Sequence, residues 1–103
     1  MTQKPHDFIA MLAERFPACF FVFEGRRRPL KLKIHLNIAE QMPEMTPQEI
    51  NFALRHYCGN VRYVLARCIE VTPRLDLAGA AVGEVTASEA ENSRRAIAGI
   101  RKR

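Results

Sequence analysis

Basic side chains in the middle of this sequence are the residues whose chemistry is easiest to name. They comprise an arginine run at 26–28, Arg55 four residues after Asn51, and Arg62 and Arg67 on either side of Tyr63. Arginine holds phosphate or carboxylate oxygens through two parallel hydrogen bonds. The central cations therefore indicate an anion-binding surface. The run at 26–28 is equally consistent with a solvated loop, and both interpretations stay open.

The charge distribution points to the same region. The chain of 103 residues has a net charge of +5 and a pI near 9.6. Residues 26–74 hold nine basic and four acidic side chains, whereas residues 1–25 hold two and three. A basic excess focused in one region favours a polyanionic partner.

Motifs for catalysis and metal binding are absent from the sequence. It contains no glycine-rich phosphate loop, no nucleophile elbow and no paired acidic motif. His6, His35 and His56 lie far apart, and Cys58 is two residues from His56, so their side chains diverge on a helix. We therefore predict a protein that is not an enzyme and has no metal or cofactor.

Composition indicates a folded protein in a reducing compartment. Hydrophobic residues make up 48% and charged residues 26% of the chain, as in ordinary globular domains. The three cysteines are odd in number and lie in apolar stretches, which argues against a disulfide framework. No apolar run has the length of a membrane span, and no signal peptide is recognisable. We predict a cytoplasmic monomer without membrane contact.

A central segment, residues 46–63, must position the basic side chains. Thr46 and Glu49 fit a capping box, with Pro47 at the first helical position. An apolar stripe follows at helical spacing, and Gly59 with Asn60 favours a stop there. The stripe consists of Ile50, Ala53, Leu54, Tyr57 and Cys58.

A second short helix is expected over residues 61–68. We predict that Val61, Val64, Leu65 and Cys68 face inward, which would turn Arg62, Tyr63 and Arg67 outward. The two helices could also form a helix-turn-helix, although the short second helix fits this motif poorly.

The remaining segments complete a fold that is mainly α with a small β-hairpin (α+β). Helices are predicted over residues 6–15 and 29–42, a buried apolar segment over 19–23, and a hairpin over 74–85 with Gly79 in its turn. The alternation in residues 30–36 is also typical of a strand, but the longer four-residue repeat favours the helix. A last helix, capped by Thr86 or Ser88, should extend to Ile100 with Ala90, Ile97 and Ile100 inward. Residues 1–103 are expected to form one domain.

Six short motifs together resemble the ProQ/FinO domain, in order and in spacing. They are AERFPACF at 13–20, RPLKLKI at 28–34, ALRHY at 53–57, VRYVL at 61–65, RLDLAG at 74–79 and GEV at 83–85. The resemblance covers nearly the whole chain, which looks like a minimal member without the basic extension of some relatives. It implies a compact helical domain with one hairpin and the function of a bacterial RNA chaperone.

The resemblance also implies the residues of an RNA-binding face. The matching positions that line a concave basic face in the family are Lys31, Arg55, Arg62, Tyr63 and Arg74. A pocket for the RNA 3′ end at the start of the central helix would place Thr46 and Gln48 beside it. Members often have basic residues where this sequence has Pro47 and Asn51, which implies fewer phosphate contacts here.

These observations lead to one main hypothesis and two alternatives. The main hypothesis is an RNA chaperone that recognises terminator-type hairpins with a 3′ single-stranded tail and promotes RNA–RNA pairing in post-transcriptional regulation by small RNAs. One alternative is a DNA-binding protein of the helix-turn-helix type. The other is a basic docking module for an acidic protein partner.

Overall fold

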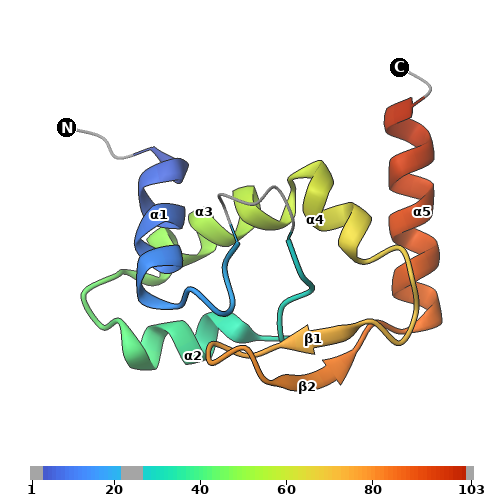
Figure 1. Ribbon diagram of the computed structural model, residues 1–103. Helices are drawn as coiled ribbons and strands as arrows, with labels where there is room; N and C mark the ends of the chain where they lie inside the picture. The colour runs from blue at the N-terminus through green and yellow to red at the C-terminus, as the bar shows by residue number, and fades with distance from the viewer. Residues whose placement is uncertain (1–3, 22–26, 102–103) are drawn as a thin grey trace.

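The structure is a computed structural model, and it describes residues 4–21 and 27–101. Within these ranges, five helices and a two-stranded antiparallel sheet follow one another along the chain (Figure 1). They are α1 (Pro5–Arg15), α2 (Ile34–Gln41), α3 (Pro47–Cys58), α4 (Val61–Ala66), β1 (Pro73–Leu75), β2 (Ala81–Glu84) and α5 (Ala87–Arg101). The predicted class, mainly α with one small hairpin, is confirmed.

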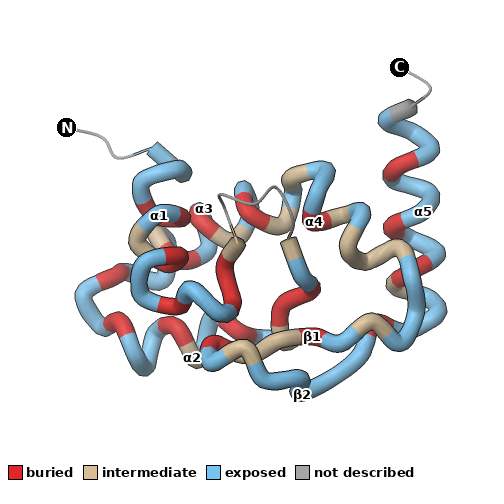
Figure 2. The backbone as a smooth tube through the Cα atoms, in the orientation of Figure 1, coloured by how far each residue is buried: buried red, intermediate tan, exposed pale blue. Residues whose placement is uncertain are grey.

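Helix α3 is the central element of the core, because α1, α2 and α4 all pack against it. Its predicted stripe is inward: Ile50, Ala53 and Tyr57 are buried, and Leu54 and Cys58 pack partly buried against the core. Burying each large apolar side chain contributes roughly 1.5–3 kcal/mol. Helix α5 packs on α4 instead, at the end of the molecule opposite α1 (Figures 1 and 2).

The start of α3 has the predicted capping box. The Glu49 amide donates to the Thr46 hydroxyl at 3.1 Å, and the Thr46 amide donates to the Glu49 carboxylate at 2.8 Å. Helix α3 ends at Cys58, as expected, but Gly59 has a right-handed φ of −79°. The left-handed angle invoked for this stop is therefore not used, and Asn60 instead caps α4 by accepting from the Arg62 amide.

The predicted helix over residues 29–42 was wrong in its first part. Residues 29–31 are extended, and α2 begins only at Ile34, after Lys33 in a left-handed conformation (φ 59°). The reason is competition for the backbone: Lys31 N–H donates to the Leu75 carbonyl at 2.8 Å, and Leu75 N–H donates to the Pro29 carbonyl at 2.9 Å. The strand-like alternation was the better indicator for these residues.

Three predicted inward positions and one predicted outward position are also corrected. Ile100 is 48% exposed, because only Ala90 and Ile97 of the predicted α5 stripe reach the interior. In α4, Val61 and Leu65 are exposed, whereas Tyr63, expected outside, is only 3% exposed.

The structure also tests the predictions for the hairpin turn, the start of α5 and the apolar segment 19–23. Gly79 in the hairpin turn has φ 85°, and a Cβ atom there would lie 2.8 Å from that of Ala18. Thr86, rather than Ser88, caps α5. Of the apolar segment 19–23, Cys19 and Phe20 are buried. Residues 22–26, including Arg26 of the arginine run, and residues 102–103 lie outside the described residues.

Candidate nucleic-acid interface

A basic hollow of about 240 Å³ lies where the segment before α2 meets α4 and β1. Helix α3 contributes Leu54 and Cys58, both from its carboxyl-terminal half. The polar and aromatic side chains around the hollow are Lys31, Lys33, His35, Tyr63, Arg67, Arg74 and Glu89, so that one carboxylate lies among the cations. Three of the predicted site residues, Lys31, Tyr63 and Arg74, are thus brought together from separate parts of the chain.

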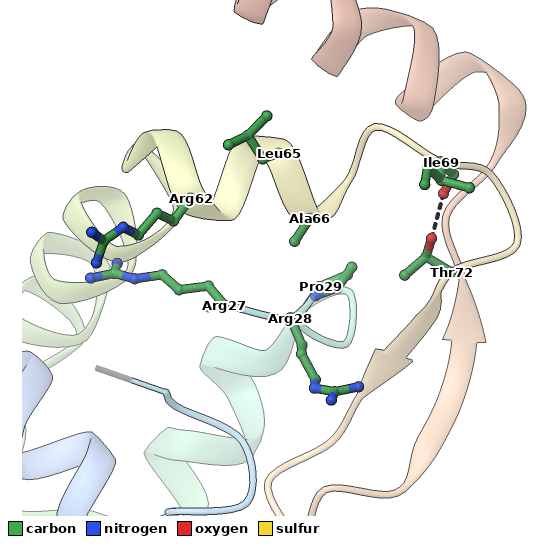
Figure 3. Close-up of a pocket in the computed structure, with 8 residues that line it drawn as sticks. All are labelled: Arg27, Arg28, Pro29, Arg62, Leu65, Ala66, Ile69 and Thr72. Carbon is green, nitrogen blue, oxygen red and sulfur yellow. Dashed lines mark hydrogen bonds between the residues drawn. The ribbon is translucent and has the colours of Figure 1, made fainter. Parts of the chain in front are cut away.

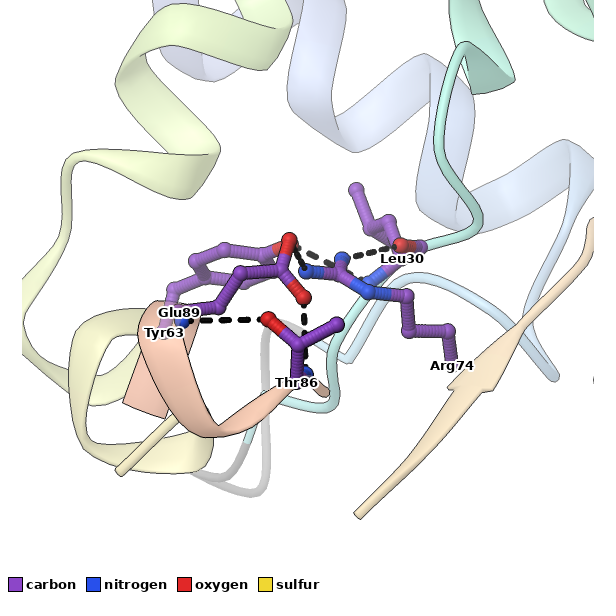
Figure 4. A network of polar contacts seen from close by, with 5 residues as sticks. All are labelled: Leu30, Tyr63, Arg74, Thr86 and Glu89. Atoms are coloured by element: carbon purple, nitrogen blue, oxygen red, sulfur yellow. Dashed lines mark hydrogen bonds and ion pairs between the residues drawn. The ribbon is translucent and has the colours of Figure 1, made fainter. Parts of the chain in front are cut away.

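Tyr63 and Arg74 form the inner wall of this hollow, and their polar groups hold the backbone of Leu30 (Figure 4). The Leu30 amide donates to the Tyr63 hydroxyl at 3.1 Å. The Arg74 guanidinium donates to the Leu30 carbonyl at 2.7 Å. Since both Leu30 backbone groups are satisfied by side chains, the extended conformation of residues 29–31 is fixed.

Arg74 has a second anchor in α5. Its guanidinium pairs with the Glu89 carboxylate at 2.7 Å. Glu89 also belongs to the capping box with Thr86, and the Thr86 backbone hydrogen bond, followed by Arg74, lowers the pKa of Glu89 below its ordinary value. Arg74 is only 3% exposed, so it braces the hollow and its charge is already offset.

Tyr63 is likewise a buried support. Its ring packs edge-on against Tyr57, with centroids 5.9 Å apart. Burial raises the pKa of Tyr63, so its hydroxyl remains protonated at neutral pH. Because the ring is 3% exposed, it lacks the free face that the outward prediction assumed.

The more accessible cations of the basic hollow are Lys31, Lys33 and Arg67. The Lys31 ammonium donates to the Asn37 side chain at 2.9 Å, which directs it along α2. The Arg67 guanidinium lies 5.1 Å from the centre of the Tyr63 ring. The site residues taken from the family motifs did not include Arg67, although its position four residues after Tyr63 was a usable signal.

The amino end of α2 opens into the same hollow. Lys33, Ile34 and His35 all line it. Within the described residues, no side chain caps this end of α2. Free amides at a helix start present positive potential to a phosphate or a hydroxyl oxygen.

The remaining predicted site residues lie elsewhere. Arg62 is exposed and lines a different, larger hollow on the other side of α4. Thr46, Gln48 and Arg55 are exposed and line neither hollow. Thr46 is eight residues before Leu54 on α3, about 12 Å at 1.5 Å per residue. The cations therefore gather beside the amino end of α2, not that of α3.

Other kinds of site find little support in the described ranges. No group of three or more histidine, cysteine, aspartate or glutamate side chains is placed to hold a metal ion in residues 4–21 and 27–101. In the same ranges no helix has the length and apolar character needed to cross a membrane.

Comparison with known proteins identifies the family of the chain. The model of the ProQ/FINO family matches residues 2–103. The chain belongs to this family. The resemblance inferred from six motifs is thereby confirmed.

Curated relatives of this chain are named RNA chaperone ProQ. The protein from Haemophilus influenzae is 34% identical over 98 residues, which cover 92% of this chain and 49% of the relative. The protein from Aliivibrio fischeri is 34% identical over 94 residues, covering 85% and 43%. The chain thus spans about half the length of the curated relatives it matches. Their names denote a non-enzymatic activity, as predicted for this protein.

Solved structures share the fold. A FinO-like RNA chaperone from Neisseria meningitidis superposes with a TM-score of 0.74 at 22% identity, over 87% of this chain and 89% of that one. A ProQ homolog from Legionella pneumophila gives 0.77 at 23% identity, over 92% and 81%. At this identity the comparison shows the fold of the chain.

Proposed function

We propose that this protein is an RNA chaperone whose 103 residues act as one RNA-binding domain and as a monomer. Family membership supports RNA as the partner. The observation that carries the proposal is the basic hollow, in which Lys31, Lys33 and Arg67 surround the uncapped amino end of α2. A cationic concavity beside a helix start suits a polyanion.

The preferred RNA is a hairpin with a 3′ single-stranded tail, as the family resemblance implies. We propose that the 3′-terminal nucleotide enters the basic hollow. Its oxygens would meet the amides of residues 33–35, and the preceding phosphates would meet Lys31 and Arg67. A hollow of about 240 Å³ is small, which suits a chain end more than a continuous duplex.

Promotion of RNA–RNA pairing and a role in regulation by small RNAs, in the cytoplasm, belong to this proposal. Arg55, Thr46 and Gln48 stand outside the contact set proposed here, because they line neither hollow. Tyr63 and Arg74 enter it as supports of residues 29–31.

The test compares hairpin binding by variants of the basic hollow. Lys31→Ala and Arg67→Ala are each expected to raise the Kd for a terminator-type hairpin about tenfold, which corresponds to about 1.4 kcal/mol. Removing the 3′ tail from the hairpin should raise the Kd of the wild type by a similar factor. For the two variants, removal of the tail should raise the Kd only slightly further. Equal affinity of the wild type for tailed and tailless hairpins would refute the 3′-end assignment.

Duplex DNA and an acidic protein, each used as a competitor of the hairpin, test the two alternative functions. Duplex DNA that displaced the hairpin at equal concentration would favour the helix-turn-helix alternative. An acidic protein that bound while hairpin RNA did not bind, even at low salt, would favour a docking module.

A further inference from the structure

A second hollow, of about 670 Å³, lies on the other side of α4 (Figure 3). We name it the arginine groove. Arg62, Leu65 and Ala66 fall on one face of α4, whereas Tyr63 and Arg67 face the basic hollow. Its side chains used below are Arg27, Arg28, Pro29, Arg62, Leu65 and Ile69. This volume is typical of sites that enclose a ligand.

The floor of the arginine groove is apolar and open to solvent. Leu65 is 46% exposed and Ile69 is 70% exposed. Pro29 is buried beneath them in the segment that Tyr63 and Arg74 hold extended. Adjacent exposed apolar side chains in a concave site favour a ligand with an apolar face.

The rim is strongly basic. Arg62 and Arg28 are exposed, and Figure 3 shows Arg62 and Arg27 extending in the same direction while Arg28 extends in another. Within residues 4–21 and 27–101, none of the three has an ion-pair partner. Among the described residues, no acidic side chain lines the groove. The ligand that fits is therefore anionic as well as partly apolar.

One of these arginines is held in position by the core. The Arg27 guanidinium donates to the Tyr57 carbonyl at 2.7 Å and lies 4.2 Å from the centre of the Tyr57 ring. Its remaining donors are thus fixed in space. A planar guanidinium held in this way is able to stack on a base.

We propose that the arginine groove binds an unpaired segment of RNA away from any 3′ end. The bases would lie on Leu65 and Ile69, and the phosphates would contact Arg28 and Arg62. Continuity favours RNA over an acidic peptide, because residues 27–29 line the arginine groove, residues 30–33 line the basic hollow, and α4 contributes side chains to both. This goes beyond the proposed function, because it adds a second RNA site with a different requirement.

The test uses a circular, unstructured single-stranded RNA, which has no 3′ end. The protein is first saturated with the tailed hairpin, and labelled circular RNA is then titrated at low salt. We expect a ternary complex with the wild type. Leu65→Glu and Arg62→Ala should each weaken circular RNA binding at least tenfold while hairpin affinity changes less than threefold.

Ile100→Glu is the matched control, because Ile100 has nearly the same exposure as Leu65 and lines neither hollow. This control should retain most of the circular RNA binding. No ternary complex with the wild type, or equal binding by Leu65→Glu, would refute the proposal. So would binding of an acidic leucine-rich peptide to the complex in place of circular RNA.

Failure of the proposed 3′-end site can be distinguished from failure of the arginine groove. If the hairpin itself fails to bind, circular RNA is titrated on the free protein. Binding that is sensitive to Leu65→Glu would then support the arginine groove without the 3′-end site.

Discussion

Arg67 is the residue that most changes the predicted binding face. Its guanidinium rests over Tyr63 and lines the basic hollow, yet its buried Nε has no hydrogen-bond partner among the described residues. A buried unpaired donor costs about 1–3 kcal/mol. A phosphate oxygen in the hollow would contact the terminal guanidinium nitrogens of Arg67, not its buried Nε.

We predict that Arg67→Ala weakens hairpin binding more than the removal of one arginine elsewhere on the surface does. Arg95 is the control, since its side chain is 74% exposed and pairs only with Glu91. Both variants lose one positive charge, so long-range attraction falls equally. Filter binding should show about a tenfold loss for Arg67→Ala and less than a twofold loss for Arg95→Ala; equal losses would mean that only net charge matters.

The variant Tyr63→Phe distinguishes a structural role of the Tyr63 hydroxyl from a direct contact with RNA. It removes the acceptor for the buried Leu30 amide and should lower the free energy of unfolding by about 1–2 kcal/mol in urea. Because the ring stays in place, hairpin affinity of the folded variant should change less than threefold. Unchanged stability with a large loss of affinity would instead support a direct contact between the hydroxyl and RNA.

At the scale of elements, sequence reasoning found the caps and missed the tertiary hydrogen bonds. The Thr46 capping box was predictable because all of its partners lie within four residues. The extended conformation at Leu30 was not, since its partners Tyr63 and Arg74 lie 33 and 44 residues away. The same bond to Tyr63 sets the rotation of α4, whose 6 residues carry too little periodicity to show it.

Thr46→Ala should cost about 0.5–2 kcal/mol of stability through loss of the α3 cap. The control is Ser88→Ala, because Ser88 is exposed and its hydroxyl makes no hydrogen bond with the described residues. Urea unfolding should separate the two variants by about 1 kcal/mol. We expect hairpin affinity of folded Thr46→Ala to stay within twofold of the wild type; a tenfold loss would restore the amino end of α3 to the site.

The Thr86–Glu89 cap links α5 to the basic hollow through Arg74, and it predicts a pH dependence. The pKa of Glu89 in the folded state lies below 4.5, its ordinary value. Its contribution to stability is therefore present above about pH 4.5 and is lost as the pH falls through the folded pKa. Glu89→Gln should be less stable than the wild type at pH 7, and the difference should shrink as the pH falls below 4.5 and through the folded pKa. A constant difference across this range would contradict the ion pair.

For the whole molecule, the sequence located the basic excess but not the surface on which it lies. Charge counts placed it in residues 26–74, and the family motifs selected the matching positions. Only the folded chain shows that Lys31, Tyr63 and Arg74 line the basic hollow, that Arg62 lines the arginine groove, and that Arg55 lines neither. Arg62 and Tyr63 are adjacent in the sequence, but they lie on different faces of the six-residue helix α4 and line different hollows.

Salt dependence reports on this arrangement. If Lys31, Lys33 and Arg67 contact phosphates in the basic hollow, log K for the tailed hairpin should fall with log salt with a slope of about −2 to −3. Arg67→Ala should reduce the slope by about one. A slope near zero would mean that phosphate contacts do not drive binding.

The central claim is that the RNA 3′ end lies at the amino end of α2 in the basic hollow. The most direct measurement is an amide NMR titration of the protein with a tailed hairpin. We predict the largest shifts at Lys33, Ile34 and His35, and small shifts at Gln48 and Glu49. Large shifts at the start of α3, with residues 33–35 unchanged, would contradict the account.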